Sequence, residues 1–159
     1  MHTSSPTNPR AGLPRRMAAL LYDVFLVGAI WMVLGFVLQL AFGTGTSTLV
    51  DGKVETDPLF SNILFTVMLL SCGGFYILFW CRSGQTLGMI AWRIKVEDRE
   101  GRLITPGSGL IRFIAAWPSF FCLGAGYFWL YIDKENDALH DKLSKTRVVL
   151  LPKTSRPFD

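Results

Sequence analysis

The chain has 159 residues, of which half are hydrophobic and 18% are charged. Because soluble domains carry about one quarter charged residues, this composition favours a membrane protein, and the gathering of apolar residues into long blocks favours it further. The net charge of +4 comes without a nucleic-acid recognition motif, and the basic residues flank the apolar blocks. We therefore expect the basic residues to contact a lipid bilayer and not a nucleic acid.

The N-terminal residues 1–13 are polar and rich in proline, which predicts a disordered tail. The first apolar block follows at residues 16–42, and as a helix it reaches roughly 40 Å, more than a hydrocarbon core of about 30 Å. A cleaved signal peptide has a shorter apolar core of about 7–15 residues, so we expect a retained first span. Arg16 lies at the entrance of this span and Asp23 lies inside it.

A polar loop at residues 43–58 separates the first apolar block from the second, which covers residues 59–81. The pair Asp51-Gly52 suits a type I′ turn and predicts a hairpin within the loop. Lys53 is the one basic residue of the loop, against three acidic ones. Such a loop belongs on the non-cytoplasmic side of the membrane.

Residues 82–109 are polar again, and their Lys and Arg content places them on the cytoplasmic side with the N-terminus. Alternating residues between 93 and 105 predict a small β-hairpin. The run Ser83–Gly88 resembles a phosphate loop superficially but lacks its Gly-Lys-Ser/Thr ending. We interpret it as a tight turn that starts an interfacial helix.

The third apolar block, residues 110–132, has basic segments on both flanks, and both therefore look cytoplasmic. About twenty residues cannot cross a membrane twice. A helix broken at Pro118 and at Gly124–Gly126, re-entrant or interfacial, satisfies both flanks, and a plain third crossing is the alternative. We favour the broken block.

After the third block, residues 137–145 suit a helix and residues 146–151 suit a strand whose nearest partners lie at 93–105. The predicted fold is thus a mainly α membrane protein: a small bundle of about three apolar helices, the third one broken, with a small cytoplasmic β element. Residues 14–152 form the membrane domain, and residues 153–159 form a C-terminal tail.

Asp23 is the first candidate for function, because an ionisable residue within a span costs about 2.5–3.5 kcal/mol on insertion scales. Arg16 lies two helical turns before it, on nearly the same face, at a distance of roughly 10 Å. That distance is too long for a direct pair in a straight helix, so Asp23 needs another partner. An ion-handling role and a purely structural role both remain open.

His140 and Asp141 form a second polar group on a short predicted helix. Neither a nucleophile elbow nor a cluster of metal ligands accompanies them, so we expect no enzyme, no metal and no cofactor. A structural role for Asp141 is favoured, in which it bonds to the backbone or pairs with a basic residue near the membrane face.

The order and spacing of several short motifs between Pro14 and Leu150 resemble the RDD family of bacterial membrane proteins. These motifs are Arg16–Asp23, Gly84–Gly88, Arg93–Val96, Arg112, Leu139–Thr146 and Val148–Val149. The family is named for one arginine and two aspartates, which by position are Arg16, Asp23 and Asp141. Met89 departs from the pattern, because family members often carry Lys or Arg there.

The resemblance implies a multi-pass protein of the bacterial cytoplasmic (inner) membrane with a cytoplasmic N-terminus. The family's general function is unsettled; transport of unidentified ligands has been suggested, and some members are linked to sodium–proton exchange. We expect a transport-related protein in which Asp23 handles a proton or monovalent cation, with Arg16 and Asp141 completing a polar network. The secondary site residues are Gln85, Thr86, Arg112, His140 and Thr146.

The alternative is a non-enzymatic accessory or assembly factor in which the same network fixes the packing of the spans. The chain is small and has few intramembrane charges, so we expect a homo-oligomer or a complex with another membrane protein.

Overall fold

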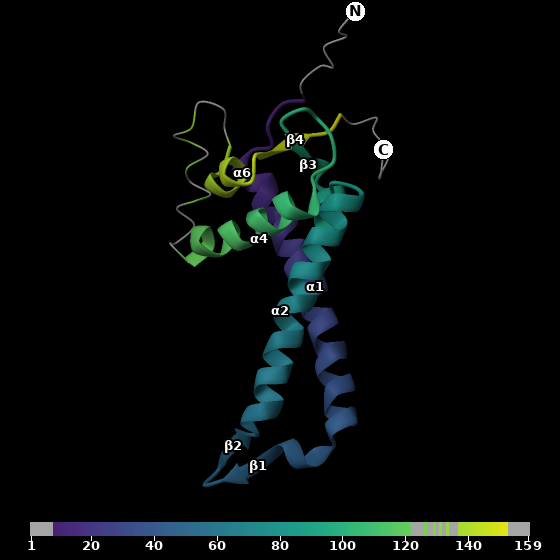
Figure 1. Ribbon diagram of the computed structural model, residues 1–159, viewed down its shortest axis with the longest axis vertical. Helices are drawn as coiled ribbons and strands as arrows, with labels where there is room; N and C mark the ends of the chain where they lie inside the picture. The colour runs from purple at the N-terminus through teal and green to yellow at the C-terminus, as the bar shows by residue number, and fades with distance from the viewer. Residues whose placement is uncertain are drawn as a thin grey trace, which may run out of the picture. The chain divides into compact units, whose positions relative to one another are not determined.

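The computed structural model describes residues 8–121, 126, 129, 131, 133 and 137–152. These residues form two compact units, each with its own internal contacts. The polar unit contains Met1–Asp23 and Tyr76–Asp159, and the hairpin unit contains Val24–Phe75. Helices dominate the structure (Figure 1), as the predicted fold class requires.

Among the described residues, two helices are long and apolar enough to cross a membrane: α1 (Leu13–Phe42) and α2 (Pro58–Arg82). Most of their apolar side chains are exposed, which is the opposite of a helix in the core of a soluble protein. Both coincide with predicted apolar blocks. This confirms a mainly helical chain with two candidate spans.

The hairpin unit contains a short 3-10 helix, η1 (Thr44–Thr46), and the two-stranded pair of β1 (Ser47–Val50) and β2 (Lys53–Thr56). Asp51 and Gly52 connect the strands with φ angles of 49° and 74°, as a type I′ turn requires, so the predicted hairpin is confirmed. Within this unit, the Trp31 indole N–H donates to the carbonyl of Met68 at 3.1 Å and thereby joins the two long helices.

Besides the ends of α1 and α2, the elements of the polar unit whose bounds lie within the described residues are the helices α3, α4 and α6 and one antiparallel sheet. In chain order these elements are α3 (Leu87–Ala91), β3 (Ile94–Asp98), α4 (Pro106–Phe121), α6 (Leu139–Leu143) and β4 (Thr146–Leu150). Its hydrophobic core comprises Ala11, Ala19, Trp80, Met89, Ile94, Val96, Ile104 and Val148. Figure 1 shows α4 beside α6, and these two helices carry Arg112 and Asp141.

Strand β4 pairs with β3 in antiparallel register from Ile94↔Leu150 to Asp98↔Thr146, which confirms the predicted partner region. The predicted hairpin within residues 93–105 is wrong, because residues 102–105 form no strand. Asp98 accepts the N–H groups of Glu100 and Arg102, both at 2.8 Å, and Gly101 has a φ of 84°. This tight turn directs the chain into α4. Strand β3 therefore pairs with β4 and not with residues 102–105.

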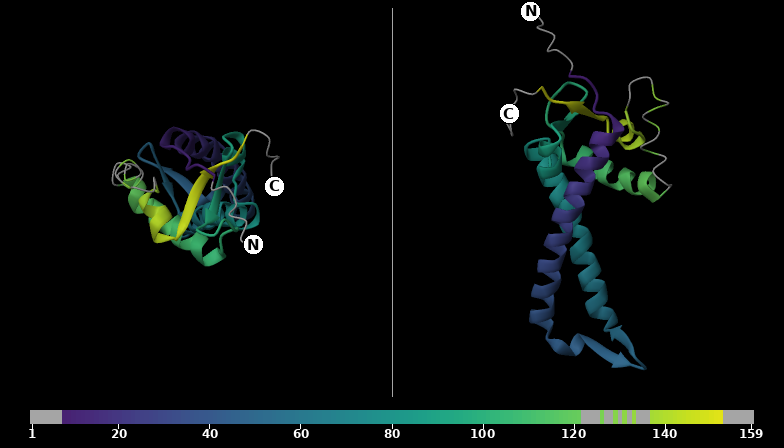
Figure 2. Two further views of the ribbon diagram at one scale, coloured as in Figure 1. Left: turned by 90° about the horizontal axis from the view of Figure 1, so that it is seen from above. Right: turned by 180° about the vertical axis from the view of Figure 1, so that it is seen from behind.

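Part of the expected disordered tail is ordered. Pro9 accepts from the N–H of Leu150 at 2.8 Å, and Ala11 donates to the carbonyl of Val148 at 3.0 Å. Ala11 is also 1% exposed. Residues 9–11 therefore lie along the free edge of β4, as Figure 2 shows, while residues 1–7 and the C-terminal tail 153–159 are outside the described residues.

The third apolar block begins earlier than predicted, and α4 continues through Pro118 instead of breaking there. Proline lacks the N–H that would donate to the carbonyl of Ile114, and next to it the Ser119 hydroxyl donates to the carbonyl of Ala115 at 2.9 Å. Gly124 lies outside the described residues. Gly126 is helical, and a Cβ on it would lie 2.9 Å from the Cα of Ser119, so a glycine is required at this close approach.

Candidate functional site

The polar unit holds two buried clusters of polar residues. We call the group of Arg16, Arg112 and Asp141 the arginine–aspartate centre. We call the group of Asp23, Thr86 and Gly88 the Asp23 site. Together they contain most of the predicted site residues.

Asp141 is fully buried and forms ion pairs with two arginines from different helices. Arg16, in the first turn of α1, donates to one carboxylate oxygen, and Arg112, in α4, donates to the other. The backbone N–H of Ala138 donates to the same carboxylate at 3.1 Å, at the start of α6. Asp141 therefore connects α1, α4 and α6, and it both bonds to the backbone and pairs with basic residues, as its predicted structural role requires.

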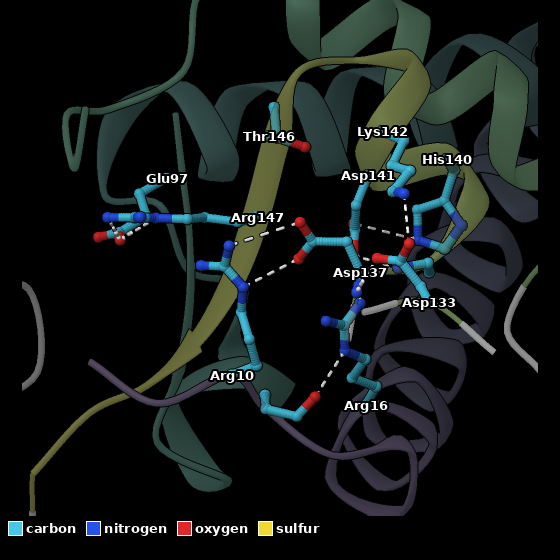
Figure 3. Close-up of polar contacts among 12 residues, drawn as sticks. Arg10, Arg16, Glu97, Asp133, Asp137, His140, Asp141, Lys142, Thr146 and Arg147 are labelled. Atoms are coloured by element: carbon cyan, nitrogen blue, oxygen red, sulfur yellow. Dashed lines mark hydrogen bonds and ion pairs between the residues drawn. The ribbon is translucent and has the colours of Figure 1, made fainter. Parts of the chain in front are cut away.

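Further contacts fix the orientation of the two guanidinium groups. Arg16 Nε donates to the carbonyl of Ala11 at 2.9 Å, and Arg112 Nη1 donates to the Thr146 hydroxyl at 2.8 Å. The Arg112 guanidinium also lies 5.1 Å from the centre of the Trp80 ring, within the range of a cation–π contact. Figure 3 shows Arg16, His140 and Asp141 together, with the pairs Arg10–Asp137 and Glu97–Arg147 nearby.

His140 Nε2 lies 3.5 Å from the Asp141 carboxylate. Burial lowers the pKa of His140 to about 4; Asp141 opposes this shift, and Arg112 and Arg16 add to it. His140 is therefore neutral at pH 7. Burial by itself raises the pKa of Asp141, but the Arg112 and Arg16 guanidinium groups hold it well below its usual range, so Asp141 is ionised.

Asp23 is also buried, at 2% exposed, but its hydrogen-bond donors are neutral. The Thr86 hydroxyl donates to one carboxylate oxygen at 2.5 Å, and the backbone N–H of Gly88 donates to the other at 2.9 Å. Thr86 precedes α3 and accepts the N–H of Met89 at 3.2 Å, so its single hydroxyl hydrogen is directed to Asp23.

Gly88 has to be a glycine for this contact. A Cβ at this position would overlap the carbonyl oxygen of Ala19 and would lie 2.8 Å from Asp23 Oδ1. The backbone of α3 thus packs directly on α1. The turn before it bends at Gly84, with a φ of 73°, which agrees with the predicted turn and short helix.

The structure separates the three residues that the sequence predicted as one network. Arg16 meets Asp141, but among the described contacts none joins Asp23 to either of them. Gln85 belongs to neither cluster, because its side-chain amide donates to the carbonyl of Ile94 at 2.8 Å and ties the turn to β3.

Several contributing groups were not singled out from the sequence as partners: the Gly88 N–H, the Ala11 carbonyl and the Trp80 ring. Two of them are backbone groups, which leave no side-chain signal. Met89, the departure from the family pattern, is buried in the core. Within the described ranges, no three or more His, Cys, Asp or Glu side chains are grouped to hold a metal ion.

Comparison with known proteins relates the chain to one family. The sequence model of the RDD family matches residues 10–145. An uncharacterized protein of Rickettsia prowazekii (strain Madrid E) is 26% identical over 98 residues, which cover 62% of this chain and 55% of that relative. The chain thus matches about half the length of this curated relative. No solved structure matches the chain. Because the family match covers most of the sequence, including both polar clusters, the chain belongs to the RDD family.

Proposed function

We propose that the chain is a transport-related protein of the bacterial cytoplasmic membrane in which Asp23 binds and releases a proton or a monovalent cation. One observation carries the proposal: Asp23 is a buried carboxylate on an apolar candidate span, and its hydrogen-bond donors are a hydroxyl and a backbone N–H.

The other buried carboxylates described in the polar unit have arginine partners. Glu97 pairs with Arg147, Asp137 with Arg10, and Asp141 with Arg16 and Arg112. A buried carboxylate without a cation carries a large desolvation cost, and binding a proton or a small cation relieves it. Asp23 is therefore the group whose charge state is best placed to change during a transport cycle.

Charge distribution supports a cytoplasmic polar unit. Its described residues include twelve Lys or Arg and seven Asp or Glu. The loop of the hairpin unit has Lys53 against Asp51, Glu55 and Asp57. By the positive-inside rule, the N-terminus and the β3–β4 sheet then face the cytoplasm, and the β1–β2 hairpin faces the other side. The part of the chain that the structure describes offers two candidate spans, so transport calls for a homo-oligomer or a partner membrane protein.

A second function, as a non-enzymatic accessory or assembly factor, has its own supporting observation. The arginine–aspartate centre is a buried ion-pair group that joins three helices, and such a group serves to fix a fold. In that case the protein would act by binding another membrane protein.

Ion flux separates the two functions. The purified protein is reconstituted into liposomes, an inside-acidic pH gradient is imposed, and the gradient is followed with a pH-sensitive dye while Na⁺, K⁺ or choline is added. We expect one of the inorganic cations to collapse the gradient, and Asp23→Asn to lower the rate at least tenfold. Asp51→Asn is the matched control, because Asp51 is an exposed carboxylate in a turn that accepts Asn readily.

Equal rates for the wild type and Asp23→Asn would contradict the proposal. A folded wild-type protein that moves no cation would leave the accessory function as the better account.

A further inference from the structure

Helix α4 exposes an apolar face and buries a polar one. Leu110, Ile111, Ile114 and Trp117 are 49%, 51%, 59% and 40% exposed. Their spacing places them on one stripe of the helix. On the opposite side, Arg112 and Ser119 are 5% and 3% exposed. This polarity is inverted relative to a surface helix of a soluble protein.

The rotation of α4 about its own axis is fixed by its buried contacts. Arg112 pairs with Asp141, which holds the polar side of the helix inward. The ring of Phe113 lies 6.3 Å from that of Tyr76, and a Cβ on Gly109 would lie 3.6 Å from Ile77, so the same helix packs on the end of α2. The apolar stripe cannot turn inward without breaking this ion pair.

The surroundings of α4 indicate which partner covers the stripe. The segment of α2 that α4 contacts, Tyr76–Cys81, belongs to a candidate membrane span, and Leu78 on that segment is 62% exposed. Trp92, Trp129 and Tyr131 in the same unit are exposed by 40% or more. Exposed tryptophan and tyrosine side chains are typical of the membrane–water interface. The excess of basic residues in this unit favours anionic headgroups.

We propose that α4 lies in the plane of the cytoplasmic membrane surface, with Leu110, Ile111, Ile114 and Trp117 inserted among the acyl chains of an anionic bilayer. At 16 residues α4 is about 24 Å long, shorter than a hydrocarbon core of about 30 Å. A helix of this kind buries its apolar face about 5–10 Å into the boundary between headgroups and acyl chains. The Arg112–Asp141 pair then orients a lipid-embedded helix from its protein side.

Spin labels measure this depth directly. The native cysteines Cys72, Cys81 and Cys122 are replaced by alanine, and a single label is placed at Ile114 in the full chain. The protein is reconstituted into vesicles of phosphatidylcholine and phosphatidylglycerol. The accessibility of the label to oxygen, which partitions into lipid, is compared with its accessibility to a water-soluble nickel complex. Labels at Phe25 on α1 and Glu100 in the β3–α4 turn give the span and aqueous references.

We expect the label at Ile114 to be at least several-fold more accessible to oxygen than to the nickel complex, at a depth between the two references. A label at Ile111 gives an independent reading should the Ile114 variant fail to fold. Nickel accessibility equal to that at Glu100 would overturn the proposal. Strong spin–spin broadening at Ile114 would also overturn it, because a second copy of the chain would then cover the stripe. We expect Asp23→Asn to leave the depth of the Ile114 label unchanged. A negative result in the flux assay and a negative result for the depth of α4 can therefore be told apart.

Discussion

Asp141 and Asp23 are both buried aspartates of the polar unit, but arginines surround the first and neutral donors surround the second. A carboxylate between two guanidinium groups stabilises the fold only when it is ionised, because neutralising it leaves two buried cations without a counter-charge. A carboxylate between a hydroxyl and a backbone N–H can change charge without leaving a cation unpaired. We therefore expect Asp141 to stabilise the fold and Asp23 to change its charge, and four experiments test that difference.

The largest effect is expected from Asp141→Asn. This change leaves Arg16 and Arg112 buried together without a counter-charge, so we expect a loss of about 3–5 kcal/mol in the free energy of unfolding. Denaturation in detergent micelles, followed by circular dichroism, measures it. Glu100→Gln is the control, because Glu100 is exposed and its substitution should change stability by less than about 0.5 kcal/mol. If Asp141→Asn were as stable as the wild type, Asp141 would not stabilise the fold more than Asp23 does.

Gly88→Ala should be the next most damaging. The added methyl group meets the Ala19 carbonyl and the Asp23 carboxylate, which forces α3 away from α1 and costs about 1–3 kcal/mol. Gly107→Ala is the matched control, because nothing lies within 4 Å of a Cβ at that position in the first turn of α4. The same denaturation measurement applies, and equal effects for the two glycines would show that α3 does not pack on Asp23 as described.

The pH dependence of stability tests the arginine–aspartate centre through His140. The folded-state pKa of about 4 lies below the ordinary value of 6.5, so the unfolded state binds more protons between these pH values, and stability falls as pH falls. From pH 7 to pH 5 we expect a loss of about 2 kcal/mol. His140→Gln should flatten the profile over this range. An unchanged profile in that variant would mean that another group titrates.

Asp23→Asn should have the smallest effect, a change of less than about 1 kcal/mol in the free energy of unfolding. An amide has the shape of the carboxylate and fits between the Thr86 hydroxyl and the Gly88 N–H, and the change removes a buried charge. Unfolding curves at neutral pH measure it alongside the flux assay. A loss as large as that of Asp141→Asn would show that the Asp23 site also serves mainly to hold the fold.

Local sequence features predicted much of this fold. The lengths of the apolar blocks indicated α1 and α2, and Asp51-Gly52 indicated its turn, because each signal depends on neighbouring residues. The pairing of β4 with the region of β3 followed from an apolar strand that needed a partner. The path of α4 through Pro118 was missed, because proline usually kinks or breaks a helix, and no local signal showed that the helix continues past it here.

The partners of the two aspartates were harder to predict. Asp141 meets Arg16 across 125 residues, and the resemblance to the RDD family supplied both positions in advance. Asp23 meets Thr86 across 63 residues and Gly88 through its backbone N–H, a group that every residue except proline possesses. No pattern of side chains distinguishes such a donor, so the sequence grouped Asp23 with the wrong partners.

The bonds of Pro9 and Ala11 to β4 have a consequence for biogenesis. A ribosome makes residues 9–11 well before residues 146–150, so the sheet edge can close only after β4 has been synthesised, and the Arg16–Asp141 pair only after α6. Until then Arg16 carries an uncompensated charge at the start of α1, a position from which a cation can orient a membrane helix during insertion. We therefore expect the same arginine to act as a topological signal early in synthesis, before it becomes the buried ion-pair partner of Asp141.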